Sequence, residues 1–387
     1  MTHVCNARPL PLVGRGATVT TPPRAPKPIT CQSRATSFCF AEKMQTGSTS
    51  PGALMFAEAA SAHEAVRAQL ASGRFAELGA RLRALKPRVV ATCARGSSDH
   101  AATFAKYLIE TRANVLTASL APSIASIYRA ETMLRDALVL LISQSGVSPD
   151  LVATAESAKR AGAFVLALVN AENSPLAAIA HETLPLGAGE ERSVAATKSF
   201  IASLSALIGL IAHWTEDDDL LAAHAASPAG AKRAWALDWS AATPSLMQAS
   251  SLYVIARGIG FGAAGEAALK LKETSGLHAE AYSAAEARHG PMALVSSGFP
   301  LLLFAQDDAA GASVAEFAAD AAARGAKAFI AGAGAAGATQ LQTVGAHVAL
   351  QPMLTIQSFY RLAHDVALAR GRNPDSPPHL TKVTETL

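Results

Sequence analysis

A short apolar run, a small polar turn and a helical stretch recur in this order along the sequence, and this repeated unit restricts the folds open to it. The apolar run at 89–94 is followed by the polar turn Arg95–Asp99 and a helical pattern over 100–110. The same order appears over 137–161 and again over 252–271. Apolar strands that alternate with helices are typical of a parallel sheet covered on both faces. The sequence therefore predicts an α/β protein with tandem three-layer α/β/α domains.

The repeat divides the chain into two domains, because it begins again after a polar and acidic stretch within 215–245. We expect the first domain over 87–225 and the second over 240–370. A helical segment over 44–86 precedes them, and a tail over 371–387 follows. One large doubly wound sheet is the alternative, but it explains the recurrence less well.

Residues 1–43 differ in composition from the rest of the chain. They hold six basic residues against one acidic residue, and three of the four cysteines. They lack the apolar core of about 7–15 residues that a secretory signal needs. We interpret them as a disordered extension, or as the result of a start assigned too early, with Met44 or Met55 as the true start. A transit peptide is the less favoured alternative.

Composition excludes several functional classes. The chain is 50% hydrophobic and 16% charged, the reverse of a disordered protein. No run reaches the ~20 apolar residues of a membrane span, and a net charge of +3 does not indicate nucleic-acid binding. Apart from the first 43 residues only Cys93 remains, and no Cys/His spacing resembles a metal site. We expect no metal, no membrane and a reducing, cytoplasmic location.

Two turns of the first domain place small hydroxyl residues where a helix begins. Helix N-termini expose unpaired N–H groups that bind anions, and the ligand crevice of an open α/β sheet lies at the carboxyl ends of its strands. Serine at such a place also serves as an ordinary helix cap. Two neighbouring turns and no nucleotide-binding glycine pattern favour a phosphorylated small molecule. The residues are Gly96, Ser97 and Ser98, and Ser143, Gln144, Ser145 and Ser148.

A third segment, Val194-Ala195-Ala196-Thr197-Lys198, precedes an apolar helix. At a helix start, Thr197 and Lys198 either bind an anion or cap the helix and lie in solvent.

Charged residues gather in a fourth segment of this low-charge chain. Glu266, Lys270 and Glu273 share one helix face by their spacing of four and seven. An exposed, salt-bridged helix face is the simpler interpretation of this spacing. His289 follows closely and precedes Gly290-Pro291, a turn that could present it to a cleft.

Taken together, these motifs resemble the SIS (sugar isomerase) domain family, specifically the isomerase half of glutamine–fructose-6-phosphate aminotransferase and its stand-alone relatives. The resemblance runs from about residue 50 to the end, and it implies two flavodoxin-like SIS domains in tandem. It rests on Ser143–Gly146, Val194–Lys198, Glu266–Glu273, Ala279–Tyr282 and His289–Pro291.

The resemblance implies roles for individual residues. Glu273 would move the proton between C1 and C2 of the sugar, His289 of a neighbouring subunit would help to open the ring, and Lys382 would contact the open-chain sugar and could form an imine. Glu266 and Lys270 would support the site. A homodimer with shared active sites is implied, without a cofactor. The implied substrate contacts are Gly96, Ser97, Ser98, Ser143, Gln144, Ser145, Ser148, Val194, Ala196 and Thr197.

Two departures from the aminotransferase narrow the expected activity. Its glutaminase domain exposes a cysteine at the mature N-terminus, whereas residue 2 here is Thr2 and residues 1–85 are too few for that domain. In addition, Ala196 stands where a serine is typical. We therefore predict a stand-alone deaminase that converts glucosamine 6-phosphate into fructose 6-phosphate and ammonia, without taking ammonia from glutamine.

Three alternatives remain open for the activity. One is a deaminase or isomerase for a related amino sugar phosphate, such as galactosamine 6-phosphate or a fructosamine phosphate. Another is an isomerase component of the aminotransferase. The third is a non-catalytic regulator that binds sugar phosphates, but the presence of Glu273, His289 and Lys382 favours an enzyme.

Overall fold

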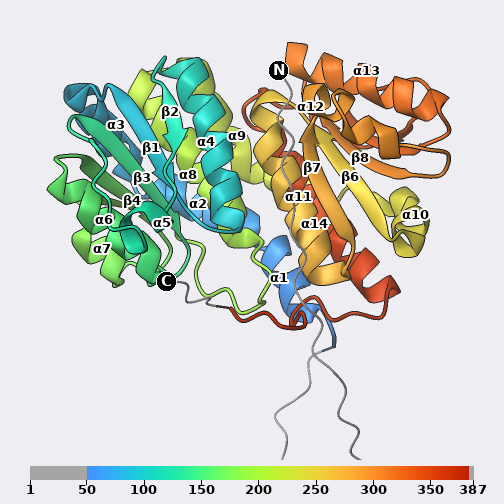
Figure 1. The fold of residues 1–387 in the computed structure, drawn as a ribbon, viewed down its shortest axis with the longest axis horizontal. Coiled ribbons are helices and arrows are strands. Elements are labelled where there is room, and N and C mark those ends of the chain that lie inside the picture. The colour runs from blue at the N-terminus through green and yellow to red at the C-terminus, as the bar shows by residue number, and fades with distance from the viewer. Residues whose placement is uncertain (1–49, 383–387) are drawn as a thin grey trace, which may run out of the picture. The chain divides into compact units, whose positions relative to one another are not determined.

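The computed structural model describes residues 50–382, and it contains two five-stranded sheets whose strands are all parallel (Figure 1). The first sheet has the strand order β2-β1-β3-β4-β5 and the second β10-β9-β8-β6-β7. Counted from its other edge, the second sheet repeats the connections of the first, and both follow the flavodoxin-like order. The predicted α/β class with two tandem sheets is confirmed. The strands are β1 (Val89–Cys93), β2 (Thr117–Ser119), β3 (Ala137–Ser143), β4 (Phe164–Val169) and β5 (Glu182–Pro185), then β6 (Ser251–Ala256), β7 (His278–Ser283), β8 (Pro300–Ala305), β9 (Lys327–Gly332) and β10 (Thr339–Leu341).

Helices cover both faces of each sheet. The outer face of the first sheet carries α5 (Ser123–Ser126), α6 (Pro149–Arg160) and α7 (Pro175–Ile179), and the outer face of the second carries α12 (Ala284–Arg288) and α13 (Ala309–Ala323). The remaining helices lie on the inner faces. They are α1 (Ala53–Ala60), α2 (Ala62–Ala71), α3 (Arg74–Leu85), α4 (Ser97–Arg112), α8 (Lys198–Thr215), α9 (Asp218–Trp235), α10 (Thr243–Gln248), α11 (Phe261–Ser275) and α14 (Gln351–Ala369), with short 3₁₀ turns at Ser240–Ala242, Gly258–Gly260 and Pro291–Leu294.

Side chains of each strand alternate between an inner and an outer core. In β3, Leu138 and Leu140 enter the inner core, whereas Val139 and Leu141 enter the outer one. Because both faces are covered, every residue of β3 is buried and the strand reads as a continuous apolar run. This explains why fully buried strands such as β3 could be located from the sequence.

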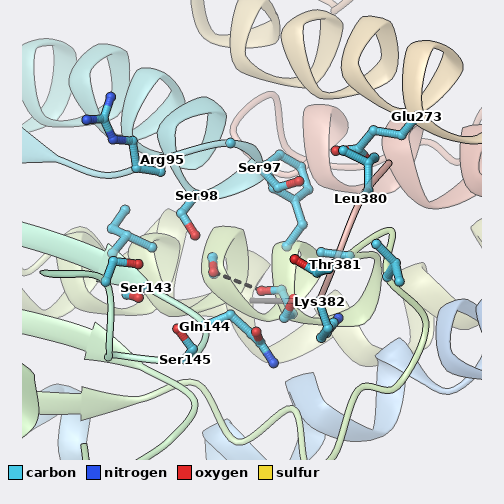
Figure 2. A pocket seen from close by; sticks show the side chains of 18 of the residues that line it. Arg95, Ser97, Ser98, Ser143, Gln144, Ser145, Glu273, Leu380, Thr381 and Lys382 are labelled. Carbon is cyan, nitrogen blue, oxygen red and sulfur yellow. Dashed lines mark hydrogen bonds between the residues drawn. The ribbon is translucent and has the colours of Figure 1, made fainter. Parts of the chain in front are cut away.

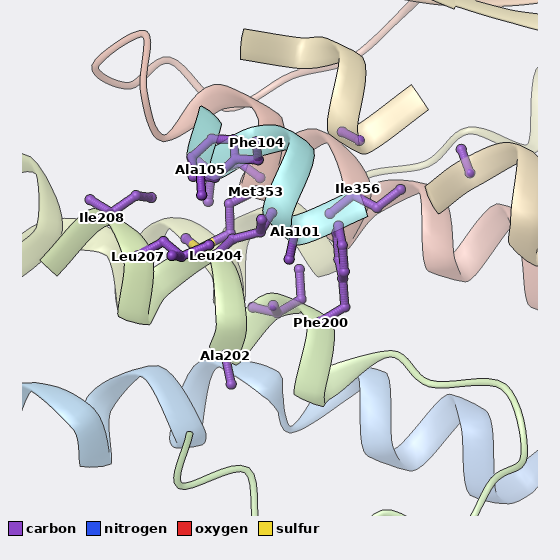
Figure 3. Packing of buried hydrophobic residues seen from close by; sticks show 14 of the residues in the cluster. Ala101, Phe104, Ala105, Phe200, Ala202, Leu204, Leu207, Ile208, Met353 and Ile356 are labelled. Atoms are coloured by element: carbon purple, nitrogen blue, oxygen red, sulfur yellow. The ribbon is translucent and has the colours of Figure 1, made fainter. Parts of the chain in front are cut away.

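One inner core joins the two sheets. Phe104 of α4 and Phe200 of α8, both from the first half, pack in the same cluster as Met353 and Ile356 of α14 (Figure 3). The described residues accordingly belong to one compact unit. Helix α8 is long and apolar enough to cross a membrane by length and composition alone, but 83% of it is buried inside the protein. It is the central helix of this core.

Several elements differ from the sequence-based expectation. The helical pattern over 53–85 forms three helices, α1 to α3, because the chain breaks at Ser61 and again at Gly73, whose left-handed φ of 66° does not continue a right-handed helix. Strand β7 was not foreseen, since its charged and polar side chains mask the strand pattern. The expectations for residues 1–43 and for a start at Met44 lie outside the described residues.

Helices α4 and α11, one from each half, approach closely because α11 presents glycines to α4. A Cβ atom on Gly262 would lie 2.5 Å from the carbonyl oxygen of His100, and one on Gly265 would lie 2.5 Å from His100 Nδ1. The absence of side chains at these positions therefore sets the spacing between the first turns of α4 and the first turns of α11.

We predict that Gly262→Ala lowers the free energy of unfolding by roughly 1–3 kcal/mol, because the added methyl group overpacks the contact with α4. This loss would occur although alanine is the better helix former. Chemical denaturation of the variant provides the measurement. Gly345→Ala is the matched control, since nothing lies within 4 Å of the Cβ position there. Equal stability of the two variants would contradict the close contact.

Candidate functional site

A cavity of about 580 Å³ opens at the carboxyl ends of β1 and β3. The strand order reverses between these two strands, which is where open α/β sheets bind ligands. Figure 2 shows Ser143 and Ser145 on one side of the cavity and Glu273 and Leu380 on the other. The cavity brings together most of the predicted site residues: Gly96, Ser97, Ser98, Ser143, Gln144, Ser145, Ser148, Val194, Ala196, Lys270, Glu273 and Lys382.

Three predicted site residues do not line the cavity. Thr197 is fully buried at the start of α8, and its backbone N–H donates to Glu191, so it neither lies in solvent nor reaches the cavity. Glu266 is fully buried behind Lys270. His289 is exposed where α12 ends. Among the residues that the structure describes, the cavity lining therefore includes no histidine.

The serine turns leave hydroxyl groups available at the cavity. Ser148 precedes α6 but makes no side-chain capping bond, so the ordinary capping role of serine is not used there. Ser143 Oγ accepts a hydrogen bond from the N–H of Gly146 at 3.0 Å, which fixes the shape of its turn. Gly146 has a φ of 64°, and a Cβ atom there would lie 2.1 Å from Ser174 Oγ, so the turn requires glycine.

These turns lie at helix N-termini, where backbone geometry favours anion binding. The turns at Ser97–Ser98 and at Ser145–Ser148 each open a helix of at least three turns, α4 and α6. Unpaired N–H groups and the partial positive charge of both helix ends face the same cavity as the hydroxyls. A phosphate group is the ligand that such a site favours.

A buried lysine between two carboxylates forms the part of the cavity wall that adjoins the Ser97–Ser98 turn. Lys270 Nζ lies 3.5 Å from Glu266 Oε1, donates a hydrogen bond to Glu273, and donates another to Ser97 Oγ at 3.1 Å. The side chain of Lys270 is 1% exposed and that of Glu273 is 21% exposed. The alternative of an exposed salt-bridged face is therefore wrong. Of the two acids, only Glu273 reaches the cavity.

Burial governs the electrostatics of this group. It raises the pKa of Glu266 to about 7, although Lys270 and the hydroxyl of Tyr360 act in the opposite direction. Burial alone would lower the pKa of Lys270, but the carboxylates of Glu266 and Glu273 outweigh it and raise that pKa. Lys270 therefore carries its charge beside the cavity at neutral pH.

The carboxylate of Glu191, which the sequence analysis did not predict as a site residue, anchors the Lys382 side chain. Lys382 Nζ lies 3.0 Å from Glu191 Oε2 and donates to the carbonyl oxygen of Ser193 at 2.7 Å. Glu191 is buried and also accepts hydrogen bonds from the N–H groups of Thr197 and Ser199 and from Ser199 Oγ. Burial would raise the pKa of Glu191, but Lys382 and these donors outweigh it and lower that pKa.

The C-terminal segment that carries Lys382 is also tied to the first helix. Asp375 accepts hydrogen bonds from the N–H groups of Leu54 and Met55 at the start of α1, and its carbonyl oxygen accepts one from Val194. Glu58 of α1 in turn accepts hydrogen bonds from the backbone of the loop that holds Glu191. Segments from both ends of the described chain therefore position one lysine.

Further lining residues were missed by the sequence analysis. Arg95 follows β1 and pairs with the fully buried Asp150 at 2.6 Å. Its place in a Gly/Ser turn was visible, but its partner 55 positions away was not. The other missed residues are Ile142, Leu151, Ser199, Phe200, Ser203, Leu380 and Thr381.

The corresponding crevice of the second sheet, between β6 and β8, is nearly closed. Its cavity measures about 30 Å³. The side chain of Gln306 is buried there and donates a hydrogen bond to the carbonyl oxygen of Arg257 at 2.8 Å. Within residues 50–382, no group of His, Cys, Asp or Glu has an arrangement that could hold a metal ion.

We predict that Glu266 makes stability fall with rising pH. Its pKa of about 7 in the folded chain exceeds the reference value of 4.5. From about pH 4.5 to 7 the folded state therefore binds more protons than the unfolded state, and stability declines through this window. Glu266→Gln removes the titration, so its stability relative to the unsubstituted chain should rise between about pH 5 and pH 8.

Denaturation of both proteins at several pH values measures this difference. The comparison with the variant is needed because burial lowers the pKa of His100 and His224 to about 4, which acts on stability in the opposite direction. A difference between the two proteins that does not change with pH would contradict the elevated pKa of Glu266.

Comparison with known proteins identifies the family to which the chain is similar. The SIS domain family matches residues 86–212 and 245–337. Glutamine–fructose-6-phosphate aminotransferase [isomerizing] of Aeropyrum pernix is 35% identical over 312 residues, which cover 74% of this chain and 49% of that protein. The chain spans about half the length of the curated relatives that it matches.

Two solved structures share the fold over most of the chain. A protein of Silicibacter pomeroyi, named as a phosphosugar isomerase, has 42% sequence identity and a TM-score of 0.79, with 83% of this chain and 99% of that chain covered. The C-terminal domain of glucosamine-fructose-6-phosphate aminotransferase from Francisella tularensis has 26% identity and a TM-score of 0.74, with 82% and 96% covered. Since the family matches more than half of the sequence and both sheets superpose on these relatives, the chain belongs to the SIS domain family.

Proposed function

We propose that the cavity binds a hexosamine 6-phosphate and that the chain converts glucosamine 6-phosphate into fructose 6-phosphate and ammonia. One observation carries the proposal: two serine turns, the carboxylate of Glu273 and the amine of Lys382 line a single cavity. A phosphate at the turns leaves the other end of a six-carbon sugar beside these two groups. The names of the relatives, which include phosphosugar isomerases and an isomerizing aminotransferase, support the substrate class.

Glu273 is suited to move a proton within the open-chain sugar. In the proposed reaction its carboxylate removes the proton from C2 of the aldehyde form and returns it to C1. The aldehyde oxygen gains a proton and the amine loses one, so that C1 becomes a hydroxymethyl group and C2 an imine. Water then adds to C2, and ammonia leaves to give the ketose. Lys270, which bonds to Glu273, fixes the position of this carboxylate in the wall of the cavity.

Lys382 and the hydroxyl groups serve the same substrate. Its Nζ is held by Glu191 and the carbonyl of Ser193, so the amine has a fixed place in the cavity wall. From there it can donate a hydrogen bond to an oxygen of the open-chain sugar. Glu191 acts as the anchor of Lys382 and is buried, so it does not contact the sugar.

Ring opening needs an acid or base group that we assign to a second subunit. Over residues 50–382 of one chain no histidine lines the cavity, whereas His289 is exposed. Histidine is suited to proton transfer near neutral pH. We therefore propose a homodimer in which His289 of one chain completes the site of the other.

The test is ammonia release over a panel of hexosamine 6-phosphates, with glutamine supplied in parallel reactions. Glucosamine 6-phosphate should give ammonia and fructose 6-phosphate without glutamine. Preferential turnover of galactosamine 6-phosphate or a fructosamine phosphate would reassign the substrate. If hexosamine 6-phosphates bind but no member of the panel is converted, the chain is a regulator that binds sugar phosphates and not an enzyme.

We predict that Glu273→Gln lowers kcat on glucosamine 6-phosphate by roughly 10²–10⁴-fold, because the variant keeps the size of the side chain but loses the base. KM should change little, since the serine turns still hold the phosphate. Steady-state kinetics measures both constants. Ser145→Ala should do the opposite and raise KM more than it lowers kcat.

The exposed Glu316 of α13 provides the matched control, because Glu316→Gln changes the same group far from the cavity lining and should leave both constants unchanged. A near-normal kcat in Glu273→Gln, on a substrate that the unsubstituted chain converts, would contradict the assignment of Glu273 as the base.

We also predict that two inactive variants restore activity when they form mixed dimers. A Glu273→Gln chain and a His289→Ala chain together contain one site with both residues intact. Activity should therefore return to about a quarter of the unsubstituted level in a statistical mixture, and to about half in purified heterodimers. Each variant mixed with itself is the control. Verified heterodimers without recovered activity would show that the site is not shared.

A further inference from the structure

A buried tyrosine stands behind the group that lines the cavity. Tyr360 of α14 is fully buried, and its hydroxyl donates a hydrogen bond of 2.9 Å to Glu266 Oε1. Tyr360 does not line the cavity. It is separated from Glu266 by 94 positions and reaches it because α11 and α14 pack together in the inner core.

A chain of polar contacts runs from this tyrosine to the cavity. Glu266 Oε1 accepts from Tyr360 and lies 3.5 Å from Lys270 Nζ, which bonds to Glu273. A carboxylate in an apolar core loses its hydration, so each donor that it keeps favours the ionised form. The Tyr360 hydroxyl is such a donor, and it is aimed at the same oxygen that faces Lys270.

We propose that Tyr360 is a positioning residue, whose hydroxyl holds Glu266 ionised and turned toward Lys270 and thereby keeps Glu273 in place at the cavity. The proposal rests on the proposed function in so far as it predicts kinetics. The ionisation and orientation of Glu266, on which the proposal depends, are properties of the protein without substrate.

Other charged groups near Glu266 come from three elements. Lys270 and Glu273 of α11 act on Glu266 directly. Glu191, in the loop before α8, and His100 of α4 interact with Lys270 instead. Burial, together with Lys270 and Lys272, lowers the pKa of His100 to about 4, so this side chain is neutral at pH 7. Strands β6 and β7 contribute apolar side chains to the inner core here: Leu252, Val254 and Ala279. Glu266, with its pKa of about 7, is the member whose charge changes near neutrality.

Tyr360→Phe tests the proposal, because it keeps the ring and removes only the donor. We expect kcat on glucosamine 6-phosphate to fall roughly tenfold with little change in KM, as for a lost hydrogen bond to a charged group. The acidic limb of the kcat–pH profile should move to higher pH by about one unit. A merely structural role would lower the melting temperature without moving this limb.

A second measurement needs no substrate. Infrared spectra of the free protein at pH 7 should show a stronger carbonyl band of protonated carboxyl groups in Tyr360→Phe than in the unsubstituted chain. In the double variant with Glu266→Gln, the added band should be absent. This readout stays valid if the chain acts on another sugar phosphate, so its failure is distinct from a failure of the proposed function.

A double-mutant cycle and a matched control complete the test. In a Glu266→Gln background, Tyr360→Phe should change kcat no further, because Tyr360 acts through Glu266. Tyr253→Phe removes the hydroxyl of a tyrosine in the outer core of the second sheet and should leave kcat and the pH profile unchanged. Additive effects in the cycle, or an infrared band that does not change in Tyr360→Phe, would overturn the proposal.

Discussion

The packing of α4 against α11 is the contact on which the site depends. Each half of the chain builds its own parallel sheet, but neither half contains a complete site. The first half supplies the serine turns, and the second supplies Lys270 and Glu273. The glycines of α11 let the two helices approach until Ser97 accepts a hydrogen bond from Lys270. The inner core thus does more than stabilise the fold, because it fixes the distance from the proposed phosphate site to the proposed base.

The free-energy cost of this arrangement comes mainly from a few buried charged side chains. Lys270 and Glu266 are both withdrawn from water, and a buried ion pair by itself is weak evidence for stability. Here the pair is supported by Ser97, Glu273 and Tyr360, so Lys270 and Glu266 each have more than one polar partner among the described residues, although Glu266 Oε2 accepts no hydrogen bond from them. Such a network suits a site that must hold one side chain in one orientation. Replacing its members by apolar residues could preserve the fold while removing the chemistry.

The sequence predicted those features that arise over short distances along the chain. The serine turns were found because strand, turn and helix follow each other directly, and Glu266, Lys270 and Glu273 were placed on one face by helical spacing. Glu191 and Tyr360 were not found, because their partners lie 191 and 94 positions away and only the packed core brings them together. Thr197 was wrongly expected at the cavity, because neighbouring residues at a helix start point in different directions.

The nearly closed crevice of the second sheet bears on how the two halves tolerate substitution. Gln306 fills the place that a ligand would occupy, and a Cβ atom on Gly260 would lie 2.4 Å from Gln306 Oε1. The remaining space, about 30 Å³, exceeds the ~10–15 Å³ that a cavity needs to hold one water molecule, and it is far smaller than the cavity of the first sheet. After β6 and β8 the chain is therefore constrained by side-chain volume, whereas after β1 and β3 it is constrained by polarity. Two copies of one topology thus tolerate different kinds of substitution: replacements that keep side-chain volume in the second crevice, and replacements that keep polar groups in the first.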